Sequence, residues 1–317
     1  MRRAHADPID GVLALDKPLG LSSNLALQKA RRLLQARKAG HTGTLDPLAT
    51  GLLPLTFGEA TKFSADLLEA DKEYLAQIEL GVTTSTGDAE GDVLERRTVD
   101  VSRARLEAVL RRFVGTGEQV PPMYSALKRH GRPLYELARL GRDVERVPRP
   151  IVVSRLQLVQ WDERRPSIEL ECSKGTYVRV LAQDIGRALG CGAHLHALRR
   201  TRVGHLRLAQ ATTLVELEGQ ELDARRARLL PIDALLTSLP RVSLDAHAAV
   251  RFGHGQKVQQ QGDWPRLRVY DALGRLLGIA SCRGGWLEAT RLVAQPCTTA
   301  RRAVNGITRE NGIEDAT

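Results

Sequence analysis

Strand-like and helix-like segments follow one another in this chain without the regular alternation that a doubly wound α/β fold requires. Apolar and polar residues alternate over 74–80 and 168–172, which is the period of a half-buried strand. Apolar residues recur at helical spacing over 25–36 and 103–114, and a third helix is expected to carry Val180, Leu181, Ile185, Ala188 and Leu189 and to end at Gly190. The sequence therefore predicts a mixed α/β (α+β) fold, with a largely antiparallel sheet and flanking helices.

Two later regions differ from the rest in composition and in the spacing of their apolar residues. Residues 125–150 hold seven Lys or Arg against three acids and little regular apolar spacing, which indicates a basic loop or flap. Short strand-like runs at 267–270, 276–280 and 286–292 are separated by glycine turns, which is typical of a small β-barrel or sandwich. We predict a large domain over 1–240 with a basic insertion at about 125–150, a small β-domain over 241–300, and a polar tail over 301–317.

Charge and cysteine content narrow the classes of partner. A net charge of +10 fits a polyanionic partner such as RNA or DNA, although a basic enzyme without nucleic acid has the same balance. We expect no membrane span and no signal peptide, a cytoplasmic location and a monomer.

Cys191, His194 and His196 lie close in sequence and could be metal ligands, but a fourth ligand is missing, so we expect no metal and no cofactor.

The densest polar segment is Gly40-His-Thr-Gly-Thr-Leu-Asp46-Pro-Leu-Ala-Thr-Gly51. Asp46 followed by Pro47 could simply begin a helix, with the aspartate as N-cap. It could equally be a carboxylate that a shaped turn fixes at the floor of a cleft. The loop alone leaves both interpretations open.

Four other features carry the same ambiguity. Arg179 could face a buried carboxylate, keeping it ionised, or could be a surface arginine. Tyr74 could be a core aromatic residue. Asp88–Asp92 lacks the ligand spacing of a calcium loop, which favours a solvated turn. The basic run from Leu198 to Gly204 could grip phosphates or be a charged helix end.

Taken together, five blocks resemble the TruB family of bacterial tRNA pseudouridine synthases. They are Asp16-Lys-Pro-Leu-Gly-Leu-Ser-Ser23, the Gly40–Gly51 loop, Lys72-Glu-Tyr74 with Gly81-Val-Thr-Thr-Ser-Thr-Gly-Asp88, Pro122-Met-Tyr-Ser-Ala126, and Lys174-Gly-Thr-Tyr-Val-Arg179 through Leu198-Arg-Arg-Thr201. The resemblance is strong over residues 10 to about 210. The C-terminal β-domain resembles a PUA RNA-binding module more weakly.

The resemblance implies roles for particular residues. Asp46 would be the catalytic aspartate, Tyr74 the tyrosine over the target base, and Arg179 the partner of Asp46. His41 would wedge into the RNA and Leu198 would pack on the flipped base. The residues expected to support the site or bind substrate are Lys17, His41, Asp88, Tyr177, Leu198, Arg199 and Arg200.

The implied reaction turns a uridine of the tRNA T loop (position 55) into pseudouridine. The base must be flipped out, its bond to the sugar broken and re-formed at C5. Attack at the sugar, addition to the ring and a glycal path all remain open, and Tyr74 is a candidate base for the C5 proton. No cofactor is required, since substrate and product are isomers. The partner would be tRNA, through its T arm and possibly the acceptor stem. An RNA-binding protein or tRNA-folding chaperone, and a base-excision glycosylase, are the competing functions.

Overall fold

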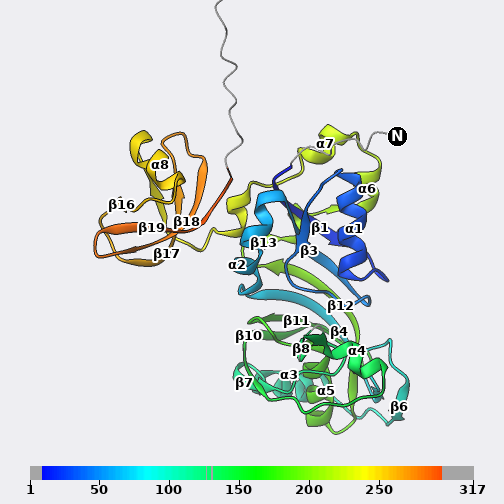
Figure 1. Ribbon diagram of the computed structural model, residues 1–317. Helices are drawn as coiled ribbons and strands as arrows, with labels where there is room; N and C mark the ends of the chain where they lie inside the picture. The colour runs from blue at the N-terminus through cyan, green and yellow to red at the C-terminus, as the bar shows by residue number, and fades with distance from the viewer. Residues whose placement is uncertain (1–8, 126, 130, 295–317) are drawn as a thin grey trace, which may run out of the picture.

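The computed structural model describes residues 9–125, 127–129 and 131–294, and its ribbon is dominated by one large, strongly bent sheet (Figure 1). Ten strands form this sheet. In spatial order they are β14 (Thr212–Thr213), β1 (Gly11–Lys17), β3 (Ala49–Phe57), β12 (Ala193–Val203), β4 (Lys72–Leu80), β11 (Ser167–Cys172), β10 (Arg149–Gln160) and β7 (Gly115–Gln119), with β2 (Ala39–His41) on β3 and β13 (Leu206–Arg207) on β12. Only β1–β14 and β3–β12 pair in parallel, which confirms the predicted mixed, largely antiparallel sheet.

The central strands owe their positions to burial on one face or both. In β1, Leu13 and Leu15 pack into the main core, whereas Val12 and Ala14 pack into a second core on the other face. A strand covered on both sides shows no polar alternation, so the pattern at 11–17 carried no period-two signal. By contrast, β4 is buried only at alternate residues, which is why its sequence predicts a strand.

Helices cover both faces of the sheet. The main core is closed by α1 (Ser23–Leu33), α3 (Arg103–Arg112), α5 (Val178–Leu189) and α6 (Leu214–Glu218). The second core lies under η1 (Gly58–Phe63), α2 (Ser64–Leu68) and η3 (Ile232–Leu235). The shorter η2 (Leu208–Gln210) and α7 (Leu222–Arg226) complete this part of the chain.

The three helices that periodicity predicts are present, and their ends follow from capping chemistry. The Ser22 side chain accepts a hydrogen bond from the backbone of Leu25 at the start of α1, and Ser102 does the same at α3. Gly190 ends α5 in a left-handed conformation at φ 84°. The predicted helices at 25–36 and 103–114 run two or three residues past the observed ends.

A separate five-stranded sheet begins with β15 (Arg241–Ser243). Its order is β15, β17 (Trp264–Tyr270), β18 (Leu276–Arg283), β19 (Trp286–Leu292), β16 (Val258–Gln259), and it curls around its own core as a half-barrel with α8 (Ala246–Gly253) (Figure 1). The three predicted runs correspond to β17–β19, whereas α8 was not predicted. Ile279 reaches into the second core of the large sheet, so the two sheets are packed together. The predicted tail over 301–317 lies outside the described residues.

The basic segment at 125–150 is more regular than predicted. It holds the hairpin strands β8 (Lys128–Arg129) and β9 (Arg132–Pro133) and the helix α4 (Leu134–Arg139). Leu134 is buried, and its backbone N–H donates to the Leu127 carbonyl oxygen. The segment predicted as a basic insertion or flap thus has secondary structure of its own, which its irregular apolar spacing did not indicate.

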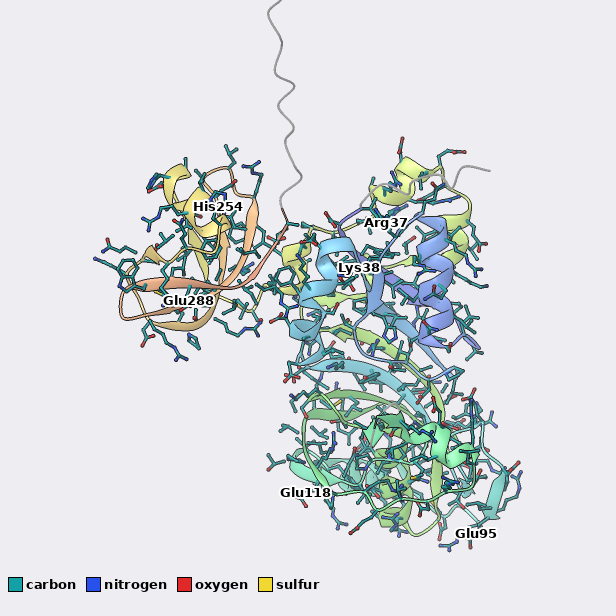
Figure 2. The ribbon with its side chains drawn as sticks, in the orientation of Figure 1. Arg37, Lys38, Glu95, Glu118, His254 and Glu288 are labelled. Atoms are coloured by element: carbon teal, nitrogen blue, oxygen red, sulfur yellow. The ribbon has the colours of Figure 1, made fainter. Side chains whose placement is uncertain are left out.

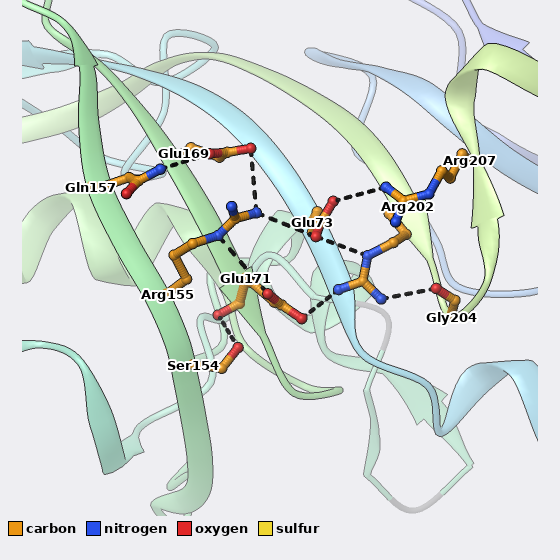
Figure 3. Close-up of polar contacts among 9 residues, drawn as sticks. All are labelled: Glu73, Ser154, Arg155, Gln157, Glu169, Glu171, Arg202, Gly204 and Arg207. Atoms are coloured by element: carbon orange, nitrogen blue, oxygen red, sulfur yellow. Dashed lines mark hydrogen bonds and ion pairs between the residues drawn. The ribbon is translucent and has the colours of Figure 1, made fainter. Parts of the chain in front are cut away.

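A charged network covers the side of β4 that faces away from the main core (Figure 3). Glu73 on β4 lies 2.9 Å from Arg202 Nε on β12 and 3.3 Å from Arg155 Nη2 on β10. Glu171 on β11 accepts from Arg202 at 2.5 Å. Other charged side chains, such as Glu95 on β6 (Val93–Arg96, paired with β5, Val82–Thr84) and Glu118 on β7, are exposed at the surface (Figure 2). No helix in the described ranges 9–125, 127–129 and 131–294 is long and apolar enough to cross a membrane.

Candidate active site

Asp46 lies on the loop between β2 and β3, and backbone contacts fix the shape of this loop. Ser23 Oγ accepts from Leu45 N at 2.8 Å and donates to the Leu45 carbonyl oxygen at 3.0 Å. The Pro47 carbonyl accepts from Gly20 N at 2.9 Å, and the Asp46 carbonyl accepts from Ala49 N at 3.0 Å. Asp46 thus occupies a turn that enters a strand, and the interpretation of Asp46–Pro47 as a helix start is wrong.

Arg179, on the first turn of α5, connects Asp46 to a second carboxylate. Its Nε lies 3.1 Å from Asp46 Oδ2, and its Nη1 lies 3.4 Å from Asp88 Oδ2. Its Nη2 donates to the Tyr124 carbonyl oxygen at 2.6 Å. Asp88 also accepts from Thr86 Oγ1 at 2.5 Å and from Glu90 N at 3.1 Å. Arg179 is buried, so the interpretation of a surface arginine is wrong. The solvated turn expected at Asp88–Asp92 is present over Ala89–Asp92, which is mostly exposed, whereas Asp88 itself is buried.

These groups line a hollow of about 750 Å³. Its wall comes from the start of α1, the Asp46 loop, the loop between β5 and β6, and the basic segment; the lining residues used below are His41, Asp46, Asp88, Glu90, Arg139 and Arg179. The Asp46 side chain keeps 40% of its exposure, facing this space, whereas that of Arg179 keeps 6%. The Asp46 carboxylate is therefore accessible from the hollow, whereas the Arg179 guanidinium that orients it is buried.

Burial and neighbouring charges set the titration of Asp46. Desolvation raises its pKa above the usual value near 3.8, and Asp88 adds to this rise. The guanidinium of Arg179 opposes the shift, followed by the ammonium of Lys17. Glu90 across the hollow also has a raised pKa, from desolvation and then from Asp88 and Asp46. An enclosed carboxylate with a raised pKa and an arginine partner is an arrangement that suits covalent or proton-transfer chemistry.

Beneath the Asp46 loop lies a fully buried layer of cations and one phenol. Arg200 donates through Nε to the Leu52 carbonyl at 2.7 Å and through Nη2 to the Gly43 carbonyl at 3.1 Å. Lys17 donates to the carbonyls of Pro18 and Leu21, and burial lowers its pKa to about 8. Both cations therefore hold backbone around the loop.

Tyr74 is buried in the same layer, directly across the β4–β12 pair from Arg200. The two side chains are hydrogen-bonded, and desolvation raises the pKa of the Tyr74 phenol above 10. The group is thus a neutral phenol at neutral pH, and Tyr74 is not among the residues that line the hollow.

The remaining predicted residues take different positions. His41 ends β2 and lines the hollow, and burial followed by the charge of Arg200 lowers its pKa. Tyr177 precedes α5, where its backbone N–H donates to Gln119 Oε1 at 2.9 Å, and burial raises the pKa of its phenol. Leu198 is buried in the main core, paired with Ala49 of β3.

The basic run from Leu198 to Gly204 is not a helix end. Residues 198–203 are the last part of β12, and a bulge between Arg200 and Arg202 interrupts its pairing with β4. Arg199 lies 2.6 Å from Asp16, Arg200 is 1% exposed, and Arg202 is held by carboxylates. These arginines are therefore engaged within the protein, because each faces a carboxylate or a backbone carbonyl.

Sequence reasoning missed several contributors to the site. Ser23 had no role beyond its place in a family block, although its hydroxyl holds the Asp46 loop. Thr86 lies in the block that ends at Asp88 and Glu90 lies just after it, yet nothing in their spacing indicates that they turn toward the hollow. The Tyr124 contact is made by a backbone carbonyl, for which a sequence gives no signal.

Comparisons with known proteins agree with this geometry. Residues 31–178 match the N-terminal domain of TruB family pseudouridylate synthases. Residues 179–237 match the tRNA pseudouridylate synthase B C-terminal domain, and residues 240–293 match the C-terminal domain of pseudouridine synthase II TruB.

Whole-chain relatives show the same affiliation. The tRNA pseudouridine synthase B of Burkholderia mallei is 59% identical over 293 residues, covering 90% of this chain and 97% of the relative. That of Dechloromonas aromatica is 58% identical over 287 residues, covering 90% and 96%. A solved Cbf5-Nop10-Gar1 complex matches with a TM-score of 0.68 and 26% identity, covering 89% of this chain and 84% of that one. The chain belongs to the TruB family and is a pseudouridine synthase.

Proposed function

We propose that this enzyme converts a uridine in the T loop of tRNA, by resemblance the one at position 55, to pseudouridine, with Asp46 as the catalytic carboxylate. The observation that carries the proposal is the accessible Asp46 carboxylate, 3.1 Å from the buried guanidinium of Arg179. The names of the relatives, tRNA pseudouridine synthase B, support tRNA as the substrate. The net charge of +10 supports a polyanionic substrate.

In this proposal the target uridine first leaves its stacked position in the RNA. The target uridine enters the hollow at a cost of a few kcal/mol for unstacking. The bond from C1′ to N1 breaks, the ring turns over and a bond from C1′ to C5 forms. The C5 proton then leaves to solvent and N1 takes up a proton, so that the product is an isomer of the substrate. Arg179 keeps Asp46 oriented and favours its ionised form, whether the carboxylate attacks the sugar, adds to the ring or deprotonates the ribose.

The buried layer suggests a role for Tyr74 other than proton acceptor. A phenol with a raised pKa is a poor base at neutral pH, and Arg200 holds its hydroxyl. We propose that its ring supports the base-binding floor from beneath. His41, on the wall of the hollow and with a lowered pKa, is proposed as the neutral ring that takes the place of the flipped uridine in the RNA.

Substrate capture is proposed to involve the two regions outside the hollow. The segment at 125–150 contributes Arg139 to the hollow wall and would clamp the T arm. The sheet β15–β19, a PUA-like unit in this proposal, would touch the acceptor end, with phosphate contacts supplying affinity. We further propose that the enzyme acts as a monomer, and a tRNA substrate supports a cytoplasmic location.

The test is tritium release from a tRNA transcript that carries C5-tritiated uridine, with wild type and Asp46→Asn assayed together. Wild type should release tritium, and Asp46→Asn should release none above background while still binding tRNA. Asp223→Asn, at an exposed aspartate on α7, is the matched control and should retain activity. If wild type binds tRNA without releasing tritium, the protein is an RNA-binding protein or folding chaperone and the proposal fails. Free uracil in place of pseudouridine would indicate the glycosylase alternative.

A further inference from the structure

A second cluster of ligand-type side chains lies on β4 and β12, away from the Asp46 hollow. Glu79 of β4 pairs directly with His194 of β12 in the antiparallel register. A bulge between Leu195 and Ala197 inserts His196 as an extra residue. This insertion lets His196 approach the same carboxylate as His194 does.

The three side chains converge on one point. His194 Nε2 lies 3.9 Å and His196 Nδ1 3.3 Å from Glu79 Oε2, and all three ligand atoms lie within 4.8 Å of one another. Ligands about 2.0–2.1 Å from a tetrahedral Zn²⁺ are separated from one another by about 3.3 Å. Small side-chain rotations would therefore complete a three-ligand set.

The tautomer of His194 is set by its backbone contact. Its Nδ1 lies 3.0 Å from the Val82 carbonyl oxygen, which can only accept, so Nδ1 carries the proton. In the neutral ring the lone pair of Nε2 then faces the Glu79 carboxylate, and two lone pairs oppose each other unless a cation lies between them. A histidine fixed through its second nitrogen is the usual setting of a metal ligand.

We propose that Glu79, His194 and His196 form a binding site for a divalent transition metal of the Zn²⁺ class, which joins β4 to β12. The fourth position would be taken by water. In the absence of metal, Arg165 supplies the positive charge: its Nε and Nη2 lie 3.1 and 3.0 Å from Glu79 Oε2. Arg165 is half-exposed in the turn between β10 and β11, so it can move into solvent when an ion binds. Sequence reasoning considered Cys191 with the two histidines and missed Glu79, because β4 lies more than a hundred residues earlier in the chain.

The test uses the full chain without a polyhistidine tag, stripped of metal with a chelator. Zn²⁺ binding is measured by competition with a chromophoric chelator, and Co²⁺ absorption reports the coordination. Wild type should bind one ion per chain, His196→Ala and Glu79→Gln should weaken binding at least about tenfold, and Arg165→Ala should tighten it. His254→Ala, at the residue that directly follows α8 (Figure 2), and Cys191→Ser should bind as wild type does.

Three results would overturn the site. Binding that is equal in wild type and His196→Ala excludes these ligands, and so does an absence of binding in the wild type. Loss of the ion in Asp46→Asn would place it in the hollow. Because His196→Ala leaves the Asp46 hollow unchanged, its tritium release should equal that of wild type, which separates this proposal from the proposed function.

Discussion

At the scale of single residues, Arg179 should set the pH at which Asp46 works. Among the charges around Asp46, that of Arg179 lowers its pKa most. A lysine at this position keeps the positive charge, but its single ammonium cannot contact Asp46, Asp88 and the Tyr124 carbonyl as the guanidinium does. The pKa of Asp46 in Arg179→Lys should therefore rise further. Since the proposed reaction needs the ionised Asp46 carboxylate, the acidic limb of the pH–activity profile should move to higher pH, and kcat should fall about 10- to 100-fold.

The measurement is the pH profile of kcat from tritium release. Arg187→Lys is the control, because Arg187 lies on the same helix, is exposed and forms an ion pair with Asp184 at 2.9 Å. An Arg179→Lys profile that falls in height without moving its acidic limb would show that the arginine does not tune Asp46.

Lys17 is a buried cation whose hydrogen bonds and charge act on stability in different ways. Removing its ammonium in Lys17→Met leaves the Pro18 and Leu21 carbonyls without this donor, which should cost about 1–3 kcal/mol of unfolding free energy. Its pKa is about 8 in the folded chain and about 10.4 in an unfolded one, so between these values the unfolded state binds more protons. Wild-type stability relative to Lys17→Met should thus increase as the pH rises from 8 to 10. Urea unfolding at several pH values, with exposed Lys29→Met as control, checks this; a difference independent of pH would contradict it.

At the scale of elements, the close approach of β3 and β12 should be essential for the Asp46 loop. Gly51 has φ +98°, and a Cβ there would lie 2.3 Å from the Arg200 carbonyl oxygen and 2.8 Å from its nitrogen. Gly51→Ala must therefore separate the two strands, shifting the β3 end of the loop. We expect a loss of at least about 1–3 kcal/mol in unfolding free energy and a large drop in kcat. Gly117→Ala in β7, where a Cβ meets nothing within 4 Å, should change neither; equal effects at both positions would refute this account.

Strand β12 and its neighbours show which parts of the structure could be predicted from the sequence. The alternation in β4 and the capped apolar stripes of α3 and α5 are local signals, so these elements were predictable from sequence. The burial of Arg200 depends on pairing with Tyr74 of β4 and Gly51 of β3, which are distant in the chain. A run of arginines has no period that distinguishes such a strand from a charged surface. For the site, the resemblance supplied Asp46, Arg179 and Asp88 and named Lys17 and Arg200 as supporting residues, but it did not indicate that these two cations are buried beneath the Asp46 loop.

At the scale of the whole molecule, the two sheets are joined by contacts that fix how they are oriented. The Tyr270 hydroxyl donates to Asp233 Oδ2 at 2.7 Å, and Arg266 lies 2.5 Å from Asp66 on α2. With Ile279 buried against the large sheet, these contacts make a substantial rotation of the small sheet costly. A rigid arrangement of this kind suits recognition of a large, folded substrate at two separated places.

The small sheet offers a surface for the second contact with tRNA. On the small sheet, Trp286 is 45% exposed and lines a surface hollow with Lys257 and Arg283. An aromatic face beside cations is suited to RNA stacking and phosphate contact. Trp286→Ala combined with Arg283→Ala should raise the KM for full-length tRNA several-fold and reduce the slope of log KM against log salt by about 1. A T-arm stem-loop, too short to reach the small sheet, should react as it does with wild type. Equal losses on both substrates would show that the two residues act through the catalytic fold, and no loss on either would remove this surface from the path of the tRNA.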